Sequence, residues 1–357
     1  SSKDVRKAVN TLHEEFFSDG NKQINVFIAG VGTVGSRLID QLRAQHQHLS
    51  DELRLNVRVV GIANSRQALL AEEGIDLSEY KVSLATASAM RISDFADSII
   101  EQNLRNSVFV DVTASSDVVA VYDKLLSKSI SVIACNKVAA SSEFEKYSHL
   151  KETAREFGTN FFFETNVGAG LPVINTLNDL LRSGDRVNRI EAVLSGTLNF
   201  VFNNYDGSRP FADVVRQAQD EGYTEPDPRL DLSGTDVARK ILILAREAGH
   251  RIEMDDIANT GFLPESCMAG SVDDFYAEME KQEPHFRKLL DDAQVQGLTL
   301  KYIASFDNGK ASVGLQSIGP DHNFANLSGK DNAVLFYTNR YSEQPLVIKG
   351  AGAGADV

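Results

Sequence analysis

Short apolar runs alternate with amphipathic stretches from Ile24 onward. The apolar runs predict strands at 24–29, 56–63, 107–114, 129–136 and 160–167. The amphipathic stretches predict a helix over 36–45, followed by a polar loop with His46 and His48, and helices centred near Val119, Tyr147 and Leu177. Repeated strand–helix–strand units are typical of a doubly wound α/β domain with a mostly parallel sheet.

The pattern changes at about Arg186. A helix through Ala218 and a long helix through Ile241 are followed by shorter strands, separated by Gly, Asn and Asp, at 299–307, 310–318, 333–339 and 345–350. Such strands indicate an antiparallel or mixed sheet, so we expect a second domain of α+β class. The predicted division is a linker at 1–23, a first domain at 24–185, a second domain at 186–330 and a segment at 331–357 that returns to the first domain.

Composition and charge exclude several classes of function. The chain has 357 residues and a formal charge of −14, without the basic runs that nucleic-acid backbones require. Cys135 and Cys267 are too few for a disulfide framework, and no apolar stretch approaches the roughly 20 residues that span a bilayer. The charged N-terminus lacks the apolar core of a signal peptide. We therefore expect no nucleic acid, no membrane and a reducing cytoplasmic compartment.

A glycine pattern, G-x-G-x-x-G, follows the first strand directly and opens a helix. Gly30 permits a tight turn, Gly32 lets the backbone approach a pyrophosphate, and Gly35 permits close packing of the helix. The helix start at Thr33 and Val34 would supply amides to the phosphates. The pattern predicts a Rossmann-type dinucleotide site, and the alternative interpretation is a tight strand-to-helix turn without a ligand.

The end of the second strand bears on the choice of cofactor. A carboxylate for the ribose 2′-hydroxyl is expected there, but the sequence has Asn64, Ser65 and Arg66. An Arg in place of the acid suits a 2′-phosphate, so the sequence favours NADP and leaves use of NAD open. The alternative is that Arg66 is an ordinary exposed loop residue.

Two further strand ends carry candidate cofactor residues, because ligands of doubly wound sheets bind beyond the carboxyl ends of strands. Thr113 and Ser115 follow the third strand, although Ser115 is equally suited to cap a helix. Lys137 follows the next strand, where its ammonium would lie near the reactive end of the cofactor. The neighbouring Cys135 raises the alternative of a thiol nucleophile, but no His follows nearby to activate it.

Carboxylates and cations are concentrated at 223–240, YTEPDPRLDLSGTDVARK, ahead of an apolar helix. Asp236 and Lys240 are four residues apart and share a helix face, although Asp236 also has the spacing of a capping box with Ser233. Ile243 lies near them in angle, which predicts that this side of the helix is covered. Two prolines stiffen the approach, so the acids that precede the helix are suited to hold the ammonium of a small amino acid. These acids are Glu225, Asp227 and Asp231.

These motifs together resemble homoserine dehydrogenase. The resemblance rests on the glycine pattern, CNK at 135–137, FETNVGAGLPVI at 163–174, LSGTLNF at 194–200 and the charged segment, and it runs from about Ile24 to the last residue. DVRKAVNTLHEEFF further resembles the linker of bifunctional aspartokinase/homoserine dehydrogenases, which implies fusion to an N-terminal aspartokinase. The tail GAGADV resembles a glycine-rich return to the nicotinamide and adds Gly352 to the candidate cofactor residues.

The resemblance implies reversible, NAD(P)-dependent interconversion of L-homoserine and L-aspartate 4-semialdehyde, a step toward threonine, methionine and isoleucine. It implies that Lys240 exchanges the proton at the substrate oxygen, with Asp236 as its partner and Lys137 as a second cation. Glu225 and Asp231 would hold the substrate amine. The family commonly has two adjacent acids where this chain has Leu230 and Asp231. A homodimer through the second domain is also implied, and that domain is then catalytic and dimerising.

The resemblance also implies a monovalent cation, usually Na⁺. Glu164 and the carbonyls of Val167, Ala169 and Leu171 would be its ligands, and hard oxygen donors suit such an ion. The residues alone predict only a glycine-rich strand-to-helix turn with Pro172 at the helix start.

Two other functions remain open. One is a different NAD(P)-dependent amino-acid dehydrogenase with the same two-domain plan. The other is a catalytically silent nucleotide-binding regulatory module, which retention of Asp236, Lys240 and Lys137 disfavours.

Overall fold

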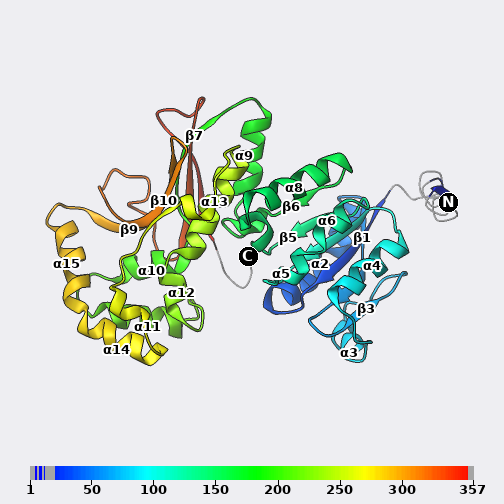
Figure 1. Cartoon of the computed structure of the whole chain (residues 1–357), viewed down its shortest axis with the longest axis horizontal. Helices are drawn as coiled ribbons and strands as arrows, with labels where there is room; N and C mark the ends of the chain where they lie inside the picture. Colours follow the sequence, from blue (N-terminus) through cyan, green and yellow to red (C-terminus); the bar gives the residue numbers. More distant parts are fainter. Residues whose placement is uncertain (1–4, 6–7, 10–11, 13–20, 353–357) are drawn as a thin grey trace. The chain divides into compact units, whose positions relative to one another are not determined.

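The computed structural model of the chain describes residues 5, 8, 9, 12 and 21–352. Contacts divide the chain into two compact units, a first unit that ends at Asn166 and a second that begins at Val167 (Figure 1). The predicted boundary at 185 therefore differs from the division by contacts. Within the described part, every helix is too short or too polar to cross a bilayer.

The first unit is built on a six-stranded sheet with the order β3-β2-β1-β4-β5-β6. Its strands pair in parallel except for the short β3, which is antiparallel to β2. The bounds are β1 (Lys22–Ala29), β2 (Leu55–Ala63), β3 (Ala68–Leu70), β4 (Ser107–Asp111), β5 (Ser131–Ala134) and β6 (Phe161–Phe162). The predicted doubly wound parallel sheet is confirmed.

Helices connect these strands, as the alternating pattern predicts. α2 (Thr33–Asp51) is longer than the predicted helix, and His46 and His48 lie within it, so their assignment to a loop was wrong. No Gly or Pro interrupts the chain between Ser36 and Val60, so nothing in the sequence ends the helix early. The remaining helices are α3 (Tyr80–Ala85), α4 (Ile92–Gln102), α5 (Ser116–Val119), α6 (Tyr122–Leu126), α7 (Val138–Ser141) and α8 (Phe144–Glu156), with a 3₁₀ turn η1 (Glu164–Asn166).

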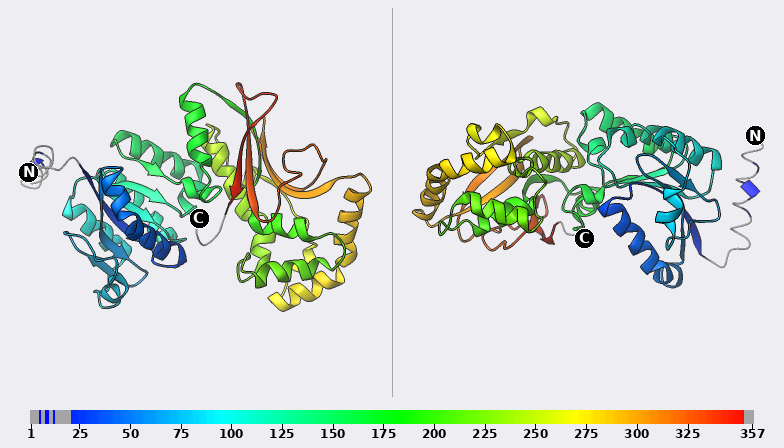
Figure 2. Two further views of the ribbon diagram at one scale, coloured as in Figure 1. Left: turned by 180° about the vertical axis from the view of Figure 1, so that it is seen from behind. Right: turned by 90° about the horizontal axis from the view of Figure 1, so that it is seen from below.

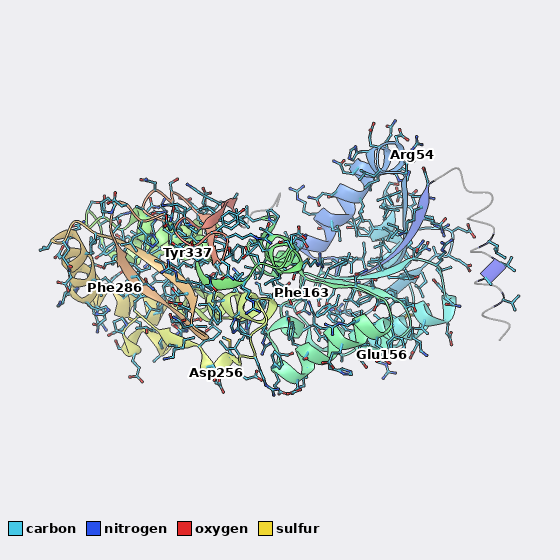
Figure 3. All side chains as sticks on the ribbon, turned by 90° about the horizontal axis from the view of Figure 1, so that it is seen from above. Arg54, Glu156, Phe163, Asp256, Phe286 and Tyr337 are labelled. Atoms are coloured by element: carbon cyan, nitrogen blue, oxygen red, sulfur yellow. The ribbon has the colours of Figure 1, made fainter. Side chains whose placement is uncertain are left out.

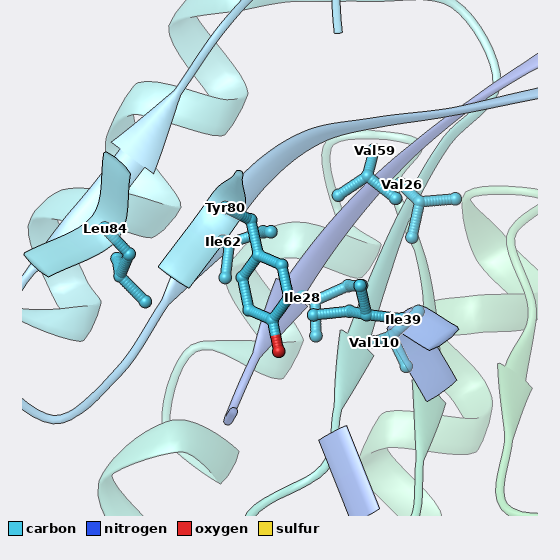
Figure 4. Close-up of a cluster of buried hydrophobic side chains, with 8 residues drawn as sticks. All are labelled: Val26, Ile28, Ile39, Val59, Ile62, Tyr80, Leu84 and Val110. Atoms are coloured by element: carbon cyan, nitrogen blue, oxygen red, sulfur yellow. The ribbon is translucent and has the colours of Figure 1, made fainter. Parts of the chain in front are cut away.

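The core and the strand register of the first unit align the carboxyl ends of its strands. Apolar side chains from β1, β2 and β4 pack with α2 and α3 in one buried cluster, Val26, Ile28, Ile39, Val59, Ile62, Tyr80, Leu84 and Val110 (Figure 4). Ala29 is in register with Ala63 on one side and with Asp111 on the other, and Asp111 with Ala134. The segments after β1, β2, β4 and β5 therefore leave the sheet along one edge.

The second unit contains a six-stranded sheet with the order β12-β11-β7-β9-β10-β8, antiparallel except for the β8–β10 pair. Its strands are β7 (Val187–Val193), β8 (Ala258–Thr260), β9 (Thr299–Asp307), β10 (Lys310–Ile318), β11 (Asp331–Thr338) and β12 (Leu346–Ala351). The red C-terminal strands lie within this sheet in the left view of Figure 2. Most of the segment that was expected to return to the first domain thus belongs to the second unit, and residues 353–357 lie outside the described residues.

Helices of the second unit pack on this sheet and on one another. They are α9 (Val173–Arg182), α10 (Gly196–Asn204), α11 (Phe211–Asp220), α12 (Pro228–Leu232), α13 (Thr235–Glu247), α14 (Val272–Lys281) and α15 (Glu283–Gln294), with 3₁₀ turns η2 (Met254–Asp256) and η3 (Glu265–Met268). Phe286 of α15, labelled in Figure 3, stacks on Phe211 of α11 with ring centroids 4.2 Å apart. α13 contacts β9, β10 and α9, and Ile243 is fully buried, as the sequence predicted.

Candidate active site

Two of the three glycines of the turn after β1 are required by the fold itself. Gly30 has φ +106°, and a Cβ there would lie 2.7 Å from the carbonyl oxygen of Val112. A Cβ on Gly35 would lie 2.0 Å from the carbonyl oxygen of Gly30. A Cβ on Gly32 would meet no described atom within 4 Å. Packing therefore gives no reason for glycine at 32, whereas close approach by a ligand does.

The start of α2 is suited to bind an anion. Its N-cap residue is Gly32, no described side chain caps the helix, and its first turn contains no acid. Thr33 is exposed, and Val34 is exposed to 59%. Amides at the start of a helix that no side chain occupies, together with the helix dipole, favour a phosphate group.

The loop after β2 lines a cavity of about 250 Å³ with the glycine turn and α3. The side-chain oxygen of Asn64 accepts hydrogen bonds from the backbone amides of Arg66 and Gln67, both at 2.8 Å, and so shapes the loop. Ser65 and Arg66 are exposed. The cavity is lined by Val31, Asn64, Gln67, Tyr80, Lys81, Leu84 and Ala85.

Lys81 is a cation at this cavity that the sequence analysis did not identify. It lies on α3, and the predicted elements included nothing between 64 and 106. The hydroxyl of the neighbouring Tyr80 is buried and has no hydrogen-bond partner among the described residues. The ammonium group of Lys81, at the cavity beside the loop after β2, would suit a phosphate substituent on the adenosine ribose.

The candidate residues after β4 and β5 are joined through the fully buried carboxylate of Asp111. It accepts hydrogen bonds from the Tyr122 hydroxyl at 2.5 Å, the Thr113 amide at 2.8 Å and the Asn136 side chain at 3.0 Å. Burial and the nearby carboxylate raise the pKa of Tyr122, so this hydroxyl remains a donor.

Asn136 extends this network to the neighbouring turns. Its side-chain amide also donates to the carbonyl of Ser115 at 3.0 Å, and its oxygen accepts from the Val138 amide at 3.0 Å. Lys137, which lies between Asn136 and Val138 in the sequence, is partly buried. Ser115 also caps α5 by accepting from the Asp117 amide, so the helix-cap interpretation of this residue is confirmed.

Cys135 is half-buried and is poorly suited to act as a nucleophile. Burial raises the pKa of its thiol, and this outweighs the hydrogen bond with Thr165 and the charge of Lys137. The thiolate, which is the reactive form, is therefore disfavoured.

In the second unit, Lys240 and Asp236 form the predicted pair on α13. Lys240 Nζ lies 2.8 Å from Asp236 Oδ2 and donates a hydrogen bond of 2.7 Å to the carbonyl oxygen of Leu194. The Lys240 side chain is only 14% exposed. No capping box forms, because the N-cap of α13 is Gly234 at φ +72° and no described side chain caps the helix. Asp236 is therefore available as a partner for the ammonium.

The acidic segment before α13 is ordered by its own polar groups. Asp227 caps α12 and pairs with Arg229, whose guanidinium reaches the Gly270 carbonyl. Asp231 accepts from the Glu225 amide at 2.9 Å, and burial raises the pKa of its carboxyl. The Glu225 side chain is exposed.

The start of α10 brings these two groups of residues together. Leu194, just before α10, accepts from Lys240, and the Thr197 hydroxyl donates to the Tyr223 carbonyl and to Asp231 at 3.4 Å. The sequence analysis noted LSGTLNF as a motif without assigning a role to Leu194 or Thr197. Their contacts depend on tertiary packing, so spacing alone gave no signal for them.

The turn proposed for a monovalent cation has unusual backbone geometry. Gly168 and Ala169 have φ of +77° and +48°, and the Leu171 amide donates to the Gly168 carbonyl at 2.9 Å. Pro172 immediately precedes α9, as predicted. Three or more His, Cys, Asp or Glu side chains nowhere gather as metal ligands among the described residues. The assignment of Glu164 and the carbonyls of Val167, Ala169 and Leu171 stays a prediction.

Gly352 has a packing role in the second unit. A Cβ there would lie 2.2 Å from the side-chain nitrogen of Asn332, which is buried. Its predicted contact with the cofactor stays a prediction.

Two family models match most of this chain. The family model for homoserine dehydrogenase matches residues 172–357, and that for the homoserine dehydrogenase NAD-binding domain matches residues 30–164. A bifunctional aspartokinase/homoserine dehydrogenase 2 of Zea mays, named chloroplastic, is 41% identical over 99% of this chain and 39% of the relative. The bifunctional enzyme 2 of Escherichia coli is 36% identical over 98% of this chain and 43% of the relative.

Solved structures are similar to this chain over most of its length. A crystal structure of a Candida auris protein of unknown function is 35% identical with a TM-score of 0.86, covering 94% of this chain and 95% of that one. A hyperthermophilic archaeal homoserine dehydrogenase in complex with NADPH shares the fold, with a TM-score of 0.70 at 22% identity and 94% of each chain covered. The chain spans about two fifths of the length of the bifunctional relatives. It belongs to the homoserine dehydrogenase family.

Proposed function

We propose that this chain interconverts L-homoserine and L-aspartate 4-semialdehyde, using NADP in preference to NAD. The observation that carries the proposal is the little-exposed ammonium of Lys240, held between Asp236 and the Leu194 carbonyl. Thr197, three residues after Leu194, donates a hydrogen bond to the Asp231 carboxylate. A proton-transfer group and carboxylates for an amine thus occur together, which suits an amino alcohol.

The residues of the first unit would hold the cofactor. The uncapped start of α2 would bind its pyrophosphate, and Lys81 with Arg66 would bind a 2′-phosphate. Bound NADP or NADPH supplies the acceptor or donor of the hydride. Thr113, Ser115 and Lys137 leave the same sheet edge and would line the nicotinamide end.

The residues of the second unit would handle the substrate. In reduction, Lys240 would donate a proton to the aldehyde oxygen as negative charge develops there, and in oxidation it would remove the proton from the hydroxyl. Asp236 would hold the ammonium in position. The carboxylates of Asp231 and Glu225 would pair with the substrate amine.

A substitution at Lys240 tests this function. The assay follows oxidation of NADPH with L-aspartate 4-semialdehyde, comparing Lys240→Met with Arg239→Met, which removes an exposed cation from the same helix. We expect a loss of at least about 100-fold in kcat for Lys240→Met and little change for Arg239→Met. Turnover of other amino alcohols but not homoserine would indicate a different amino-acid dehydrogenase. NADPH binding without any turnover would indicate a silent regulatory module.

Several broader properties belong to the same proposal. The names of the relatives support fusion to an N-terminal aspartokinase in a multifunctional enzyme. We propose that the reaction serves threonine, methionine and isoleucine synthesis in the cytoplasm, by a homodimer. The Zea mays relatives are named chloroplastic, so localisation of a tagged chain would test the compartment.

A further inference from the structure

A lysine with no role in the proposed chemistry is buried in the second unit. Lys301 of β9 is 2% exposed. Its ammonium donates to three oxygens, the side-chain oxygens of Asn199, at 3.1 Å, and Asn203, and the Leu327 carbonyl at 2.7 Å. An ammonium has three donors, so each donor has an acceptor. No ion pair of Lys301 is present among the described residues.

The two asparagines extend the contacts of this ammonium. The side-chain amide of Asn199 donates to the carbonyls of Gly329 and Asp331, and that of Asn203 to the carbonyls of Leu327 and Gly329. Both asparagines lie on α10, one turn apart. Lys301 therefore joins three parts of the second unit, β9, α10 and the segment 327–331.

The N-terminal end of α10, where Asn199 lies, carries the contacts of the proposed substrate site. The backbone N–H of Asn199 donates to the Ser195 carbonyl at 3.0 Å, and the Ser195 side chain caps the helix. On either side of Ser195 lie Leu194, which accepts from Lys240, and Thr197, which donates to the Tyr223 carbonyl and to Asp231. A shift of α10 along its axis would move both contacts together.

We propose that Lys301 is a positioning residue for the substrate, acting through Asn199 and α10 on the Leu194 carbonyl and on Thr197. This role rests on the proposed function. Lys301 holds the first turn of α10 at the distance that lets Leu194 accept from Lys240 and Thr197 reach Asp231. The hydrogen bonds of Lys301 all go to residues of the second unit, so we expect binding of the cofactor at the glycine turn of the first unit to be unaffected by its loss.

The charge state of Lys301 gives an independent readout. Burial, with the charge of Lys349, lowers the pKa of Lys301 to about 8. α10 carries no charged side chain, and the segment 319–331 that covers this face carries Asp321, His322, Lys330 and Asp331. Above pH 8 the ammonium loses one donor, so one of the three oxygens loses its partner.

Two substitutions at Lys301 and one control test the proposal in the full 357-residue chain. Lys301→Met removes the ammonium, Lys301→Arg keeps a charge that does not titrate, and Lys310→Met removes an exposed lysine from the adjacent β10. We expect Lys301→Met to raise KM for aspartate semialdehyde about tenfold, with the dissociation constant of NADPH unchanged. Lys301→Arg should restore KM and abolish the alkaline fall in kcat/KM near pH 8, and Lys310→Met should match wild type.

The possible results separate this role from the proposed function. A Lys301→Met protein that melts earlier but keeps the wild-type KM and kcat would show a purely structural lysine and overturn the proposal. If Lys301→Met does not fold, an alkaline limb in Lys301→Arg identical to that of wild type overturns it instead. Absence of wild-type turnover refutes the proposed function, and this role with it, whereas an active wild type with unaffected variants refutes this role alone.

Discussion

Lys240 and Asp236 lie one helical turn apart on α13, with Nζ and Oδ2 separated by 2.8 Å. Their exposure differs, because the Lys240 side chain is 14% exposed and that of Asp236 is 45% exposed. The carboxylate therefore lies on the solvent side of a largely enclosed ammonium. Because the Asp236 carboxylate is nearly half exposed, solvent screens the pair, and we expect its main effect on catalysis rather than on stability.

Replacing Asp236 by Asn should lower kcat about tenfold or more, because the amide can still accept a hydrogen bond but no longer offsets the charge of Lys240. Steady-state reduction of aspartate semialdehyde measures this effect. Asp213→Asn, an exposed acid of α11, is the control. Wild-type kcat in Asp236→Asn would show that the pair has no catalytic role.

Asp231 should make homoserine binding sensitive to acid. Its carboxyl has a raised pKa, so it binds a proton at higher pH than an ordinary Asp, and KM for homoserine should rise as the pH falls through that value. Asp231→Asn should raise KM at neutral pH and remove this pH dependence.

The raised pKa of Asp231 also bears on stability. A carboxyl whose pKa is raised on folding stabilises the folded protein only at acidic pH, where it is protonated. Asp231→Asn should therefore not lower the free energy of unfolding at neutral pH, as urea titration can measure.

The glycine turn offers a matched pair of substitutions. Gly32→Ala should leave stability unchanged and weaken NADPH binding at least about tenfold, because its Cβ would occupy only the space of the ligand. Gly35→Ala should lower the free energy of unfolding by about 1–3 kcal/mol, because its Cβ would collide with the Gly30 carbonyl. Fluorescence titration and thermal melting distinguish the two. Equal effects of both on stability would contradict the assignment of Gly32 to the ligand.

Tyr122→Phe should remove one of three donors to the buried carboxylate of Asp111 and cost about 1–3 kcal/mol of stability. Because the network also holds the Ser115 and Lys137 turns, NADPH affinity should fall as well. Tyr341→Phe, at an exposed position, is the control. A loss of stability with unchanged NADPH affinity would restrict the network to a role in folding.

Lys81 and Arg66 should discriminate between the two nicotinamide cofactors. Lys81→Met should lower kcat/KM for NADPH about tenfold and leave that for NADH unchanged, since a cation at this cavity would contact the 2′-phosphate. Arg66→Met should act in the same direction. Lys146→Met on α8 serves as the exposed control. An equal loss with both cofactors would place Lys81 away from the phosphate.

The sequence was sufficient for the features that a local pattern encodes. The parallel sheet follows from apolar runs at regular intervals, and the glycine turn from its place between β1 and α2. The pair of Asp236 and Lys240 follows from helical spacing alone. Each of these features depends on neighbours within a few residues along the chain.

The features that the sequence did not predict depend on tertiary packing. Lys301 alternates with Leu300 and Tyr302 in β9, so the pattern suggests an exposed lysine, yet α10 and the segment 319–331 cover that face. Thr197 gains its partners from segments distant in sequence, and Lys81 lines a cavity with residues of two distant segments, Val31 and Asn64. α9 follows a strand as in any α/β unit, but it packs against α13, so periodicity could not locate the boundary at Asn166.

The order of strands in the second sheet has a consequence for biosynthesis. β7 lies at its centre between β9 and β11, and β11 in turn is flanked by β12. All strands of the first unit are translated before β7, whereas β7 cannot pair until β9 and β11, more than a hundred residues downstream, have been translated. The nascent chain should therefore form the sheet of its first unit early, and leave β7 unpaired and accessible to chaperones until β9 and β11 have been translated.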